Sequence, residues 1–218
     1  MVQRSAGDNS FKHAAFDIVA LAASAGGLTA LIQVLAGLPS TFPAAIAIVQ
    51  HLDPRHRSLM AEILSRRTSL HVKEAEEGEM LQAGTVYVAP PNRHLLVNSD
   101  GTLSLTQSEL VHFVRPSADL LFESVAASYR DRAIAVVLTG AGSDGSMGVQ
   151  AIKKMQGTVI AQDKQTSEFF GMPGAAIQTG SADFVLPLDE IAPVLITLVS
   201  ADEQTMPPSA LDREDKSA

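Results

Sequence analysis

Three of the most apolar segments of this chain are each followed by a polar side chain that can take part in acyl transfer. These segments are residues 18–23 with Ser24 next in sequence, 44–50 with His51, and 133–138 with Asp144 in the loop beyond. A serine Oγ can attack a carbonyl carbon, a histidine can take its proton and return it to the leaving group, and an aspartate can fix the imidazole tautomer. Together the three residues predict a Ser-His-Asp catalytic triad.

The segments that must position these side chains alternate between strand and helix patterns. Apolar runs of strand length are followed by helical spacing of apolar residues over 28–38 and by a second helical segment at 58–67. This rhythm favours a parallel sheet with right-handed crossovers. Residues 94–97 and 103–105, separated by a turn at 98–101, predict an antiparallel hairpin. The expected fold class is therefore α/β, a doubly wound, mainly parallel sheet flanked by helices, with an added antiparallel hairpin.

The predicted sheet would bring the three side chains to one place. In open α/β sheets the ligand crevice lies outside the carboxyl ends of the strands, where Ser24, His51 and Asp144 all fall. Gly26 and Gly27 permit close backbone approach at the start of a helix, so that amide N–H groups and the positive end of the helix dipole face the reacting carbonyl oxygen. The spacing thus provides both a nucleophile and a stabilised oxyanion.

Taken singly, each of these residues also has a structural interpretation. Ser24 could cap a helix, His51 could be a polar loop residue, and Asp144 could cap the helix that follows it. Their joint placement at strand ends is what favours the triad. The turn at 24–27 also lacks both the phosphate-loop pattern GxxxxGK[ST] and a full GxGxxG, which disfavours nucleotide binding.

The chain offers one local group with metal-ligand character. It consists of His51, Asp53 and His56, and it lacks the paired spacing of a typical site. We therefore expect no metal and no cofactor.

Composition excludes several classes of partner and location. The 218 residues carry a formal net charge of −8, so the chain lacks the basic character that nucleic acid or an anionic membrane requires. There are no cysteines, which excludes disulfides, thiolate metal sites and a cysteine nucleophile. Neither a membrane-spanning run nor a signal peptide is recognisable, which predicts a cytoplasmic protein without membrane insertion. One folded domain is expected over 16–200, between a flexible leader at 1–15 and a disordered tail at 201–218.

Six motifs in order resemble the catalytic domain of the chemotaxis protein-glutamate methylesterase/glutaminase family, CheB. They are AASAGG at 22–27, VQH at 49–51, VKEAEEG at 72–78, YVAP at 87–90, RPS at 115–117 and LTGAGSDG at 138–145. The resemblance extends from Asp17 to Val199. It implies a CheB-type methylesterase domain that hydrolyses γ-glutamyl methyl esters, and deamidates particular glutamines, on the cytoplasmic helices of chemoreceptors.

The resemblance also implies roles for individual residues. The serine, histidine and aspartate singled out above fall on the triad positions of the family. The main-chain N–H groups of Ala25 and Ala141 are implied as oxyanion donors, although the family usually has Thr and Met at these positions. Arg115, in a motif that flanks the cleft, is implied to orient substrate.

Two departures from the family pattern bear on regulation and partners. The typical member carries an N-terminal receiver domain, whereas here the first expected strand begins at residue 18, so we expect the receiver domain to be absent. The loop at 52–56 looks more like versions fused to receptor methyltransferase modules. Methylated chemoreceptor helices, and a methyltransferase or receiver module on another chain or in a parent fusion, are the expected partners. The alternative function is a non-catalytic CheB-like regulatory or binding module that docks on a receptor or signalling partner.

Overall fold

The computed structural model describes residues 16–51, 58–111 and 113–200. The leader expected at 1–15 and the tail expected at 201–218 lie outside the described residues, as do Asp53 and His56 of the weak metal-site candidate. None of the helices within the described ranges has the length and apolarity needed to cross a bilayer.

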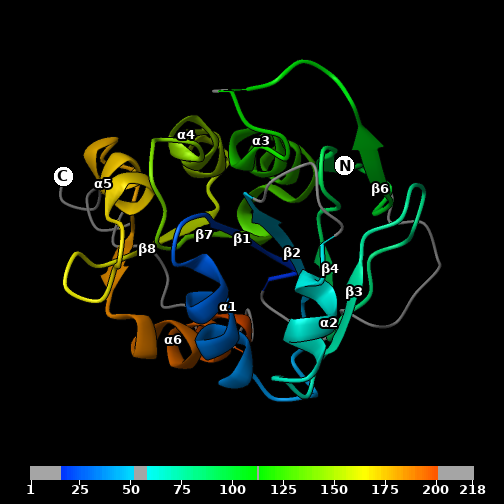
Figure 1. Ribbon diagram of the computed structural model, residues 1–218, viewed down its shortest axis with the longest axis horizontal. Coiled ribbons are helices and arrows are strands. Elements are labelled where there is room, and N and C mark those ends of the chain that lie inside the picture. The colour runs from blue at the N-terminus through cyan, green and yellow to red at the C-terminus, as the bar shows by residue number, and fades with distance from the viewer. Residues whose placement is uncertain (1–15, 52–57, 112, 201–218) are drawn as a thin grey trace, which may run out of the picture.

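A parallel sheet of seven strands runs through the centre of the described chain (Figure 1). Its strands lie in the order β3-β4-β2-β1-β7-β8-β9, and every pairing between neighbours is parallel. Their bounds are β1 Ile18–Ala23, β2 Ala45–Gln50, β3 His71–Glu74, β4 Thr85–Val88, β7 Ala133–Val137, β8 Thr158–Gln162 and β9 Phe184–Leu186. The three central strands β2, β1 and β7 are buried along their whole length, which is why their sequences are continuous apolar runs.

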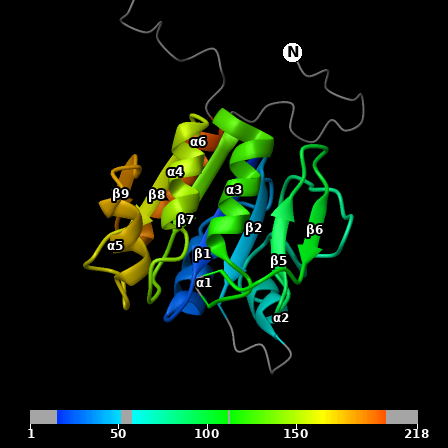
Figure 2. The ribbon, with the colours of Figure 1, turned by 90° about the horizontal axis from the view of Figure 1, so that it is seen from above.

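Helices cover both faces of this sheet (Figure 2). On one face lie α1 (Gly27–Ala36), α2 (Met60–Ser65) and α6 (Leu188–Ser200), and on the other α3 (Ala118–Tyr129), α4 (Ser146–Lys154) and α5 (Gly171–Gln178). A 3₁₀ turn, η1 (Arg130–Arg132), leads from α3 into β7. Alternate residues of β1 belong to the two cores, with Val19 and Leu21 facing α1 and Ile18 and Ala20 facing α3. The doubly wound α/β architecture predicted from the sequence is confirmed.

The predicted hairpin is also present, as a small sheet of its own. It consists of β5 (His94–Val97) and β6 (Leu103–Thr106) in antiparallel register, and no strand of the seven-stranded sheet pairs with it in the described chain. The Val97 amide donates to Ser124 Oγ at 3.0 Å, and Ser128 Oγ donates to the Val97 carbonyl at 2.9 Å. Both serines lie on α3, so the hairpin is fixed to that helix.

Candidate active site

The three predicted triad residues lie at the carboxyl ends of three adjacent strands. Ser24 directly follows β1, His51 directly follows β2, and Asp144 lies in the loop between β7 and α4. The strand β1 is where the strand order reverses, because the chain continues to β2 on one side and later adds β7 on the other. This is the topological switch point at which open α/β sheets bind ligands.

The structure brings His51 and Asp144 into direct contact. His51 Nε2 lies 2.8 Å from Asp144 Oδ2, and the two side chains are only 12% and 4% exposed. Because Nε2 is engaged by the carboxylate, Nδ1 is the ring nitrogen that can accept a proton. The described residues show no hydrogen bond from Ser24 Oγ to His51. In structures without substrate, catalytic hydrogen bonds are often long and tighten only when substrate binds.

The Asp144 carboxylate is fixed by the first turn of α3. It accepts hydrogen bonds from Ser117 Oγ at 2.9 Å, from the Ala118 amide at 2.6 Å and from the Asp119 amide at 3.1 Å. Burial alone would raise the pKa of Asp144, but the hydrogen bond from His51 and those from the two amides outweigh it and hold the pKa below its ordinary value. The lowered pKa favours the ionised form of Asp144, and this carboxylate bonds to the His51 ring.

The alternative interpretation, that Asp144 caps the helix that follows it, is wrong, because the N-cap of α4 is Gly145. The amides at the start of α4 are instead bound by Asp119 of α3, whose Oδ1 accepts from Met147 N at 2.9 Å and from Gly148 N at 2.8 Å. The amides at the start of α3 thus bond to Asp144, in the loop before α4, and the amides at the start of α4 bond to Asp119 of α3. These bonds join the start of α3 to the start of α4.

Gln50 connects the serine and the histidine, a role that the sequence analysis missed. Its buried side-chain Nε2 donates to the Ser24 carbonyl at 2.7 Å and to the His51 carbonyl at 3.2 Å. Gly27 makes room for it, since a Cβ there would lie 2.2 Å from Gln50 Oε1. The available signal was an amide side chain ending a fully apolar strand immediately before the candidate base.

Two backbone amides remain available beside the serine. Ala25 precedes Gly26, the left-handed N-cap of α1, and Ala141 lies in the exposed loop after β7. The two segments are joined, because the Ser24 amide donates to the Thr139 carbonyl at 3.0 Å and Thr139 Oγ1 donates to the Ala25 carbonyl at 3.1 Å. Within the described chain neither the Ala25 amide nor the Ala141 amide donates a hydrogen bond. Their role as oxyanion donors stays a prediction.

The guanidinium of Arg115 is hydrogen-bonded to other residues of the chain. Its guanidinium donates twice to Asn92 Oδ1, at 2.9 and 2.7 Å, and to the carbonyls of Gln107 and Ser108 at 3.1 and 2.6 Å. These bonds join the segment before β5 to the segment after β6. The geometry favours a structural role for Arg115, and the substrate-orienting role remains a prediction.

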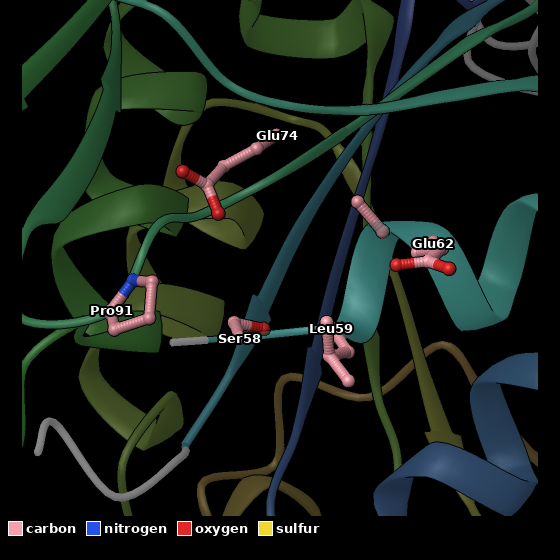
Figure 3. A pocket seen from close by; sticks show the side chains of 6 residues that line it. Ser58, Leu59, Glu62, Glu74 and Pro91 are labelled. Carbon is pink, nitrogen blue, oxygen red and sulfur yellow. The ribbon is translucent and has the colours of Figure 1, made fainter. Parts of the chain in front are cut away.

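A cavity of about 330 Å³ opens at the carboxyl ends of β3 and β4 (Figure 3). Its lining consists of Ser58, Leu59, Ala61, Glu62, Glu74 and Pro91, and none of the three triad candidates contributes to it. In the part of the chain that the structure describes, no group of three or more His, Cys, Asp or Glu side chains could hold a metal ion. The two glutamates of the cavity are therefore not part of a larger ligand cluster.

The doubly wound parallel sheet, with a serine, a histidine and an aspartate at its switch point, defines an α/β protein with the side-chain set of a serine hydrolase. The profile of the CheB methylesterase family matches residues 19–195. The chain belongs to this family, as the resemblance of its motifs predicted.

Individual relatives agree with this assignment. A protein-glutamate methylesterase/protein-glutamine glutaminase homologue of Leptospira interrogans is 43% identical over 84% of this chain and 95% of its own length. The enzymes of that name from Moorella thermoacetica and Burkholderia orbicola are 42% and 45% identical, but the match spans only 44% and 54% of their lengths. The crystal structure of the Thermotoga maritima CheB methylesterase catalytic domain superposes with a TM-score of 0.81 at 41% identity, covering 84% of this chain and 99% of that domain.

Proposed function

We propose that this protein is a serine hydrolase that removes methyl esters from glutamate side chains of chemoreceptor-type proteins and deamidates particular glutamines. The observation that carries the proposal is the Asp144 carboxylate, held by three donors of α3 and bonded to His51 beside the end of β1. Membership of the CheB methylesterase family supports the substrate class. Residues 16–200 would form the catalytic unit, acting in the cytoplasm where the methylated helices of such receptors lie.

Acylation begins at Ser24. His51 Nδ1 accepts the hydroxyl proton as Ser24 Oγ forms a bond to the ester carbonyl carbon, and the carbonyl oxygen takes up the electron pair. The amides of Ala25 and Ala141 would stabilise that oxyanion, helped by the positive end of α1. Asp144 keeps the imidazole oriented and stabilises its protonated form.

The intermediate then collapses with cleavage of the bond from carbon to the methoxy oxygen. His51 gives its proton to the departing oxygen, which releases methanol and leaves a glutamyl ester on Ser24. His51 next takes a proton from water, whose oxygen attacks the same carbon, and Ser24 leaves with that proton. The products are a glutamate side chain and the original enzyme. With a glutamine substrate the same sequence releases ammonia in place of methanol.

Incubation with a receptor cytoplasmic fragment carrying glutamyl methyl esters tests the substrate class. We expect methanol release that matches, one for one, the loss of methyl groups measured by mass spectrometry of receptor peptides. The same fragment without methyl esters is the control and should release none. Tight binding of the methylated fragment with every ester intact would instead favour the non-catalytic binding module.

A further inference from the structure

His94 is fully buried at the start of β5 and uses both ring nitrogens within the chain. Its Nε2 lies 3.0 Å from the Glu109 carbonyl, and its Nδ1 lies 3.1 Å from the Ser117 amide. A carbonyl only accepts and an amide N–H only donates, so Nε2 must carry the proton and Nδ1 must be the acceptor. The two partners therefore require one neutral tautomer of His94.

The Ser117 amide connects this imidazole to the candidate triad. Ser117 is the N-cap of α3, and its Oγ donates to Asp144 Oδ1 at 2.9 Å. The next two residues supply the amide hydrogen bonds to the same carboxylate. The three donors to Asp144 therefore belong to the consecutive residues 117–119. The first of these residues is also the one whose amide bonds to His94.

Burial also holds this backbone position, because Pro116, Ser117 and Ala118 are buried and Ala118 packs into the core beneath α3. In the segment between β6 and α3, the apolar side chains of Leu110 and Phe113 are 54% and 94% exposed, so they do not pack it against a core. Polar contacts hold the rest of the segment: Arg115 donates to Gln107 and Ser108, Val111 and Val114 exchange backbone hydrogen bonds, and His94 bonds near both ends. Among these side chains, His94 is the one that bonds directly to the Ser117 amide.

We propose that His94 is a positioning residue that holds the start of α3, and through it Asp144, in the orientation that aligns His51. It touches none of the reacting atoms and acts only through Ser117. The inference rests on the proposed function for its kinetic test, but not for its structural one.

Two substitutions at this position separate the two hydrogen bonds. In His94→Asn the amide oxygen can take the place of Nδ1 and accept from Ser117, whereas the bond to Glu109 is lost. In His94→Gln the amide nitrogen can take the place of Nε2 and donate to Glu109, whereas the acceptor for Ser117 is lost. Each variant removes one ring and one hydrogen bond, so a purely structural role predicts equal effects. His71→Asn, at an exposed histidine of β3, is the control for substitution alone.

The kinetic readout is methanol release per folded molecule. We expect His94→Asn to keep kcat within a few-fold of wild type, and His94→Gln to lower kcat on the order of 10-fold to 100-fold with KM unchanged, because misplacement of a catalytic group acts on the chemical step. Equal losses of kcat in the two variants, or no loss in His94→Gln, would overturn the proposal.

A second readout needs neither substrate nor turnover. NMR of protein labelled with ¹⁵N at histidine reports the ring protonation of His94 and the Nε2–H proton of His51 in its bond to Asp144. We expect the wild type to show the Nε2–H tautomer at His94, and the His51 proton to move in His94→Gln but not in His94→Asn. A His94 protonated at Nδ1 in wild type, or a His51 proton indifferent to both variants, would contradict the inference. If the wild type released no methanol, the proposed function would fail while this comparison would still decide the role of His94.

Discussion

Asp144 is bonded both to His51 and to the first turn of a helix that lies before it in sequence. The same carboxylate thus orients the candidate base and satisfies amide donors of α3. Asp119 also accepts hydrogen bonds from backbone amides, those at the start of α4, through its Oδ1, but it is not the carboxylate that bonds to His51. The pair allows the catalytic contribution of Asp144 to be separated from its contribution to stability.

Asp144→Asn and Asp119→Asn are expected to differ in activity but not in stability. Each replaces a carboxylate by an amide that places an NH₂ group near backbone donors, at a cost of about 1–2 kcal/mol in the free energy of unfolding. Only Asp144→Asn removes the charge that stabilises protonated His51, so we expect it to lower methanol release by about 10³-fold to 10⁴-fold. Urea unfolding and initial rates measure the two effects, and comparable activity of the two variants would show that Asp144 acts only as a cap.

At the scale of elements, the start of α3 couples the hairpin to the active site. Burial, the largest effect, lowers the pKa of His94 below its ordinary value, and the positive charge of Arg115 adds to this, while the Glu109 carbonyl and the charge of Asp144 oppose it. The imidazole that bonds to Ser117 is thereby kept neutral.

This coupling predicts two steps in the dependence of stability on pH. The unfolded chain takes up a proton on His94 at a pH near 6.5, before the folded chain does, so the free energy of unfolding is highest above that pH and falls as the pH drops below it. The lowered pKa of Asp144 contributes stability that is present above a pH of about 4 and is lost as the pH falls further.

Urea unfolding of wild type and His94→Asn between pH 8 and pH 3 would measure the two steps. Relative to wild type, the variant should lose less stability as the pH falls below about 6.5, because His94 is absent. It should keep the loss of stability below a pH of about 4 that belongs to Asp144. Superimposable pH profiles would show that His94 does not resist protonation in the folded state.

At the scale of the whole molecule, the sequence predicted the secondary-structure elements whose apolar pattern follows from their own burial. The strands β1, β2 and β7 were expected within one residue of their observed bounds, because strands buried on both faces give continuous apolar runs. The strand β3 was missed, since it is a partly exposed edge strand whose sequence His-Val-Lys-Glu has little apolar character. The helix α2 is shorter than its predicted span of 58–67.

The contacts around the triad could not be predicted in the same way. Gln50 bonds to a carbonyl 26 residues away, Ser117 Oγ bonds to a carboxylate 27 residues away, and His94 bonds to an amide 23 residues away. Such bonds depend on how strand ends and helix starts meet in space, and a pattern within one segment carries no information about that meeting. The shared location of Ser24, His51 and Asp144 could be predicted because parallel strands bring their carboxyl ends to one edge, while their catalytic roles stay a prediction.

The most direct test of the account is methanol release by Ser24→Ala from a methylated receptor fragment. Removal of the nucleophile should lower the rate by about 10⁴-fold or more. The free energy of unfolding should stay nearly unchanged, because Ser24 Oγ makes no hydrogen bond in the described chain. Ser143→Ala, at an exposed serine in the loop that carries Asp144, is the matched control and should keep the wild-type rate. Methanol release by Ser24→Ala at a rate near that of Ser143→Ala would contradict the claim that Ser24 is the nucleophile.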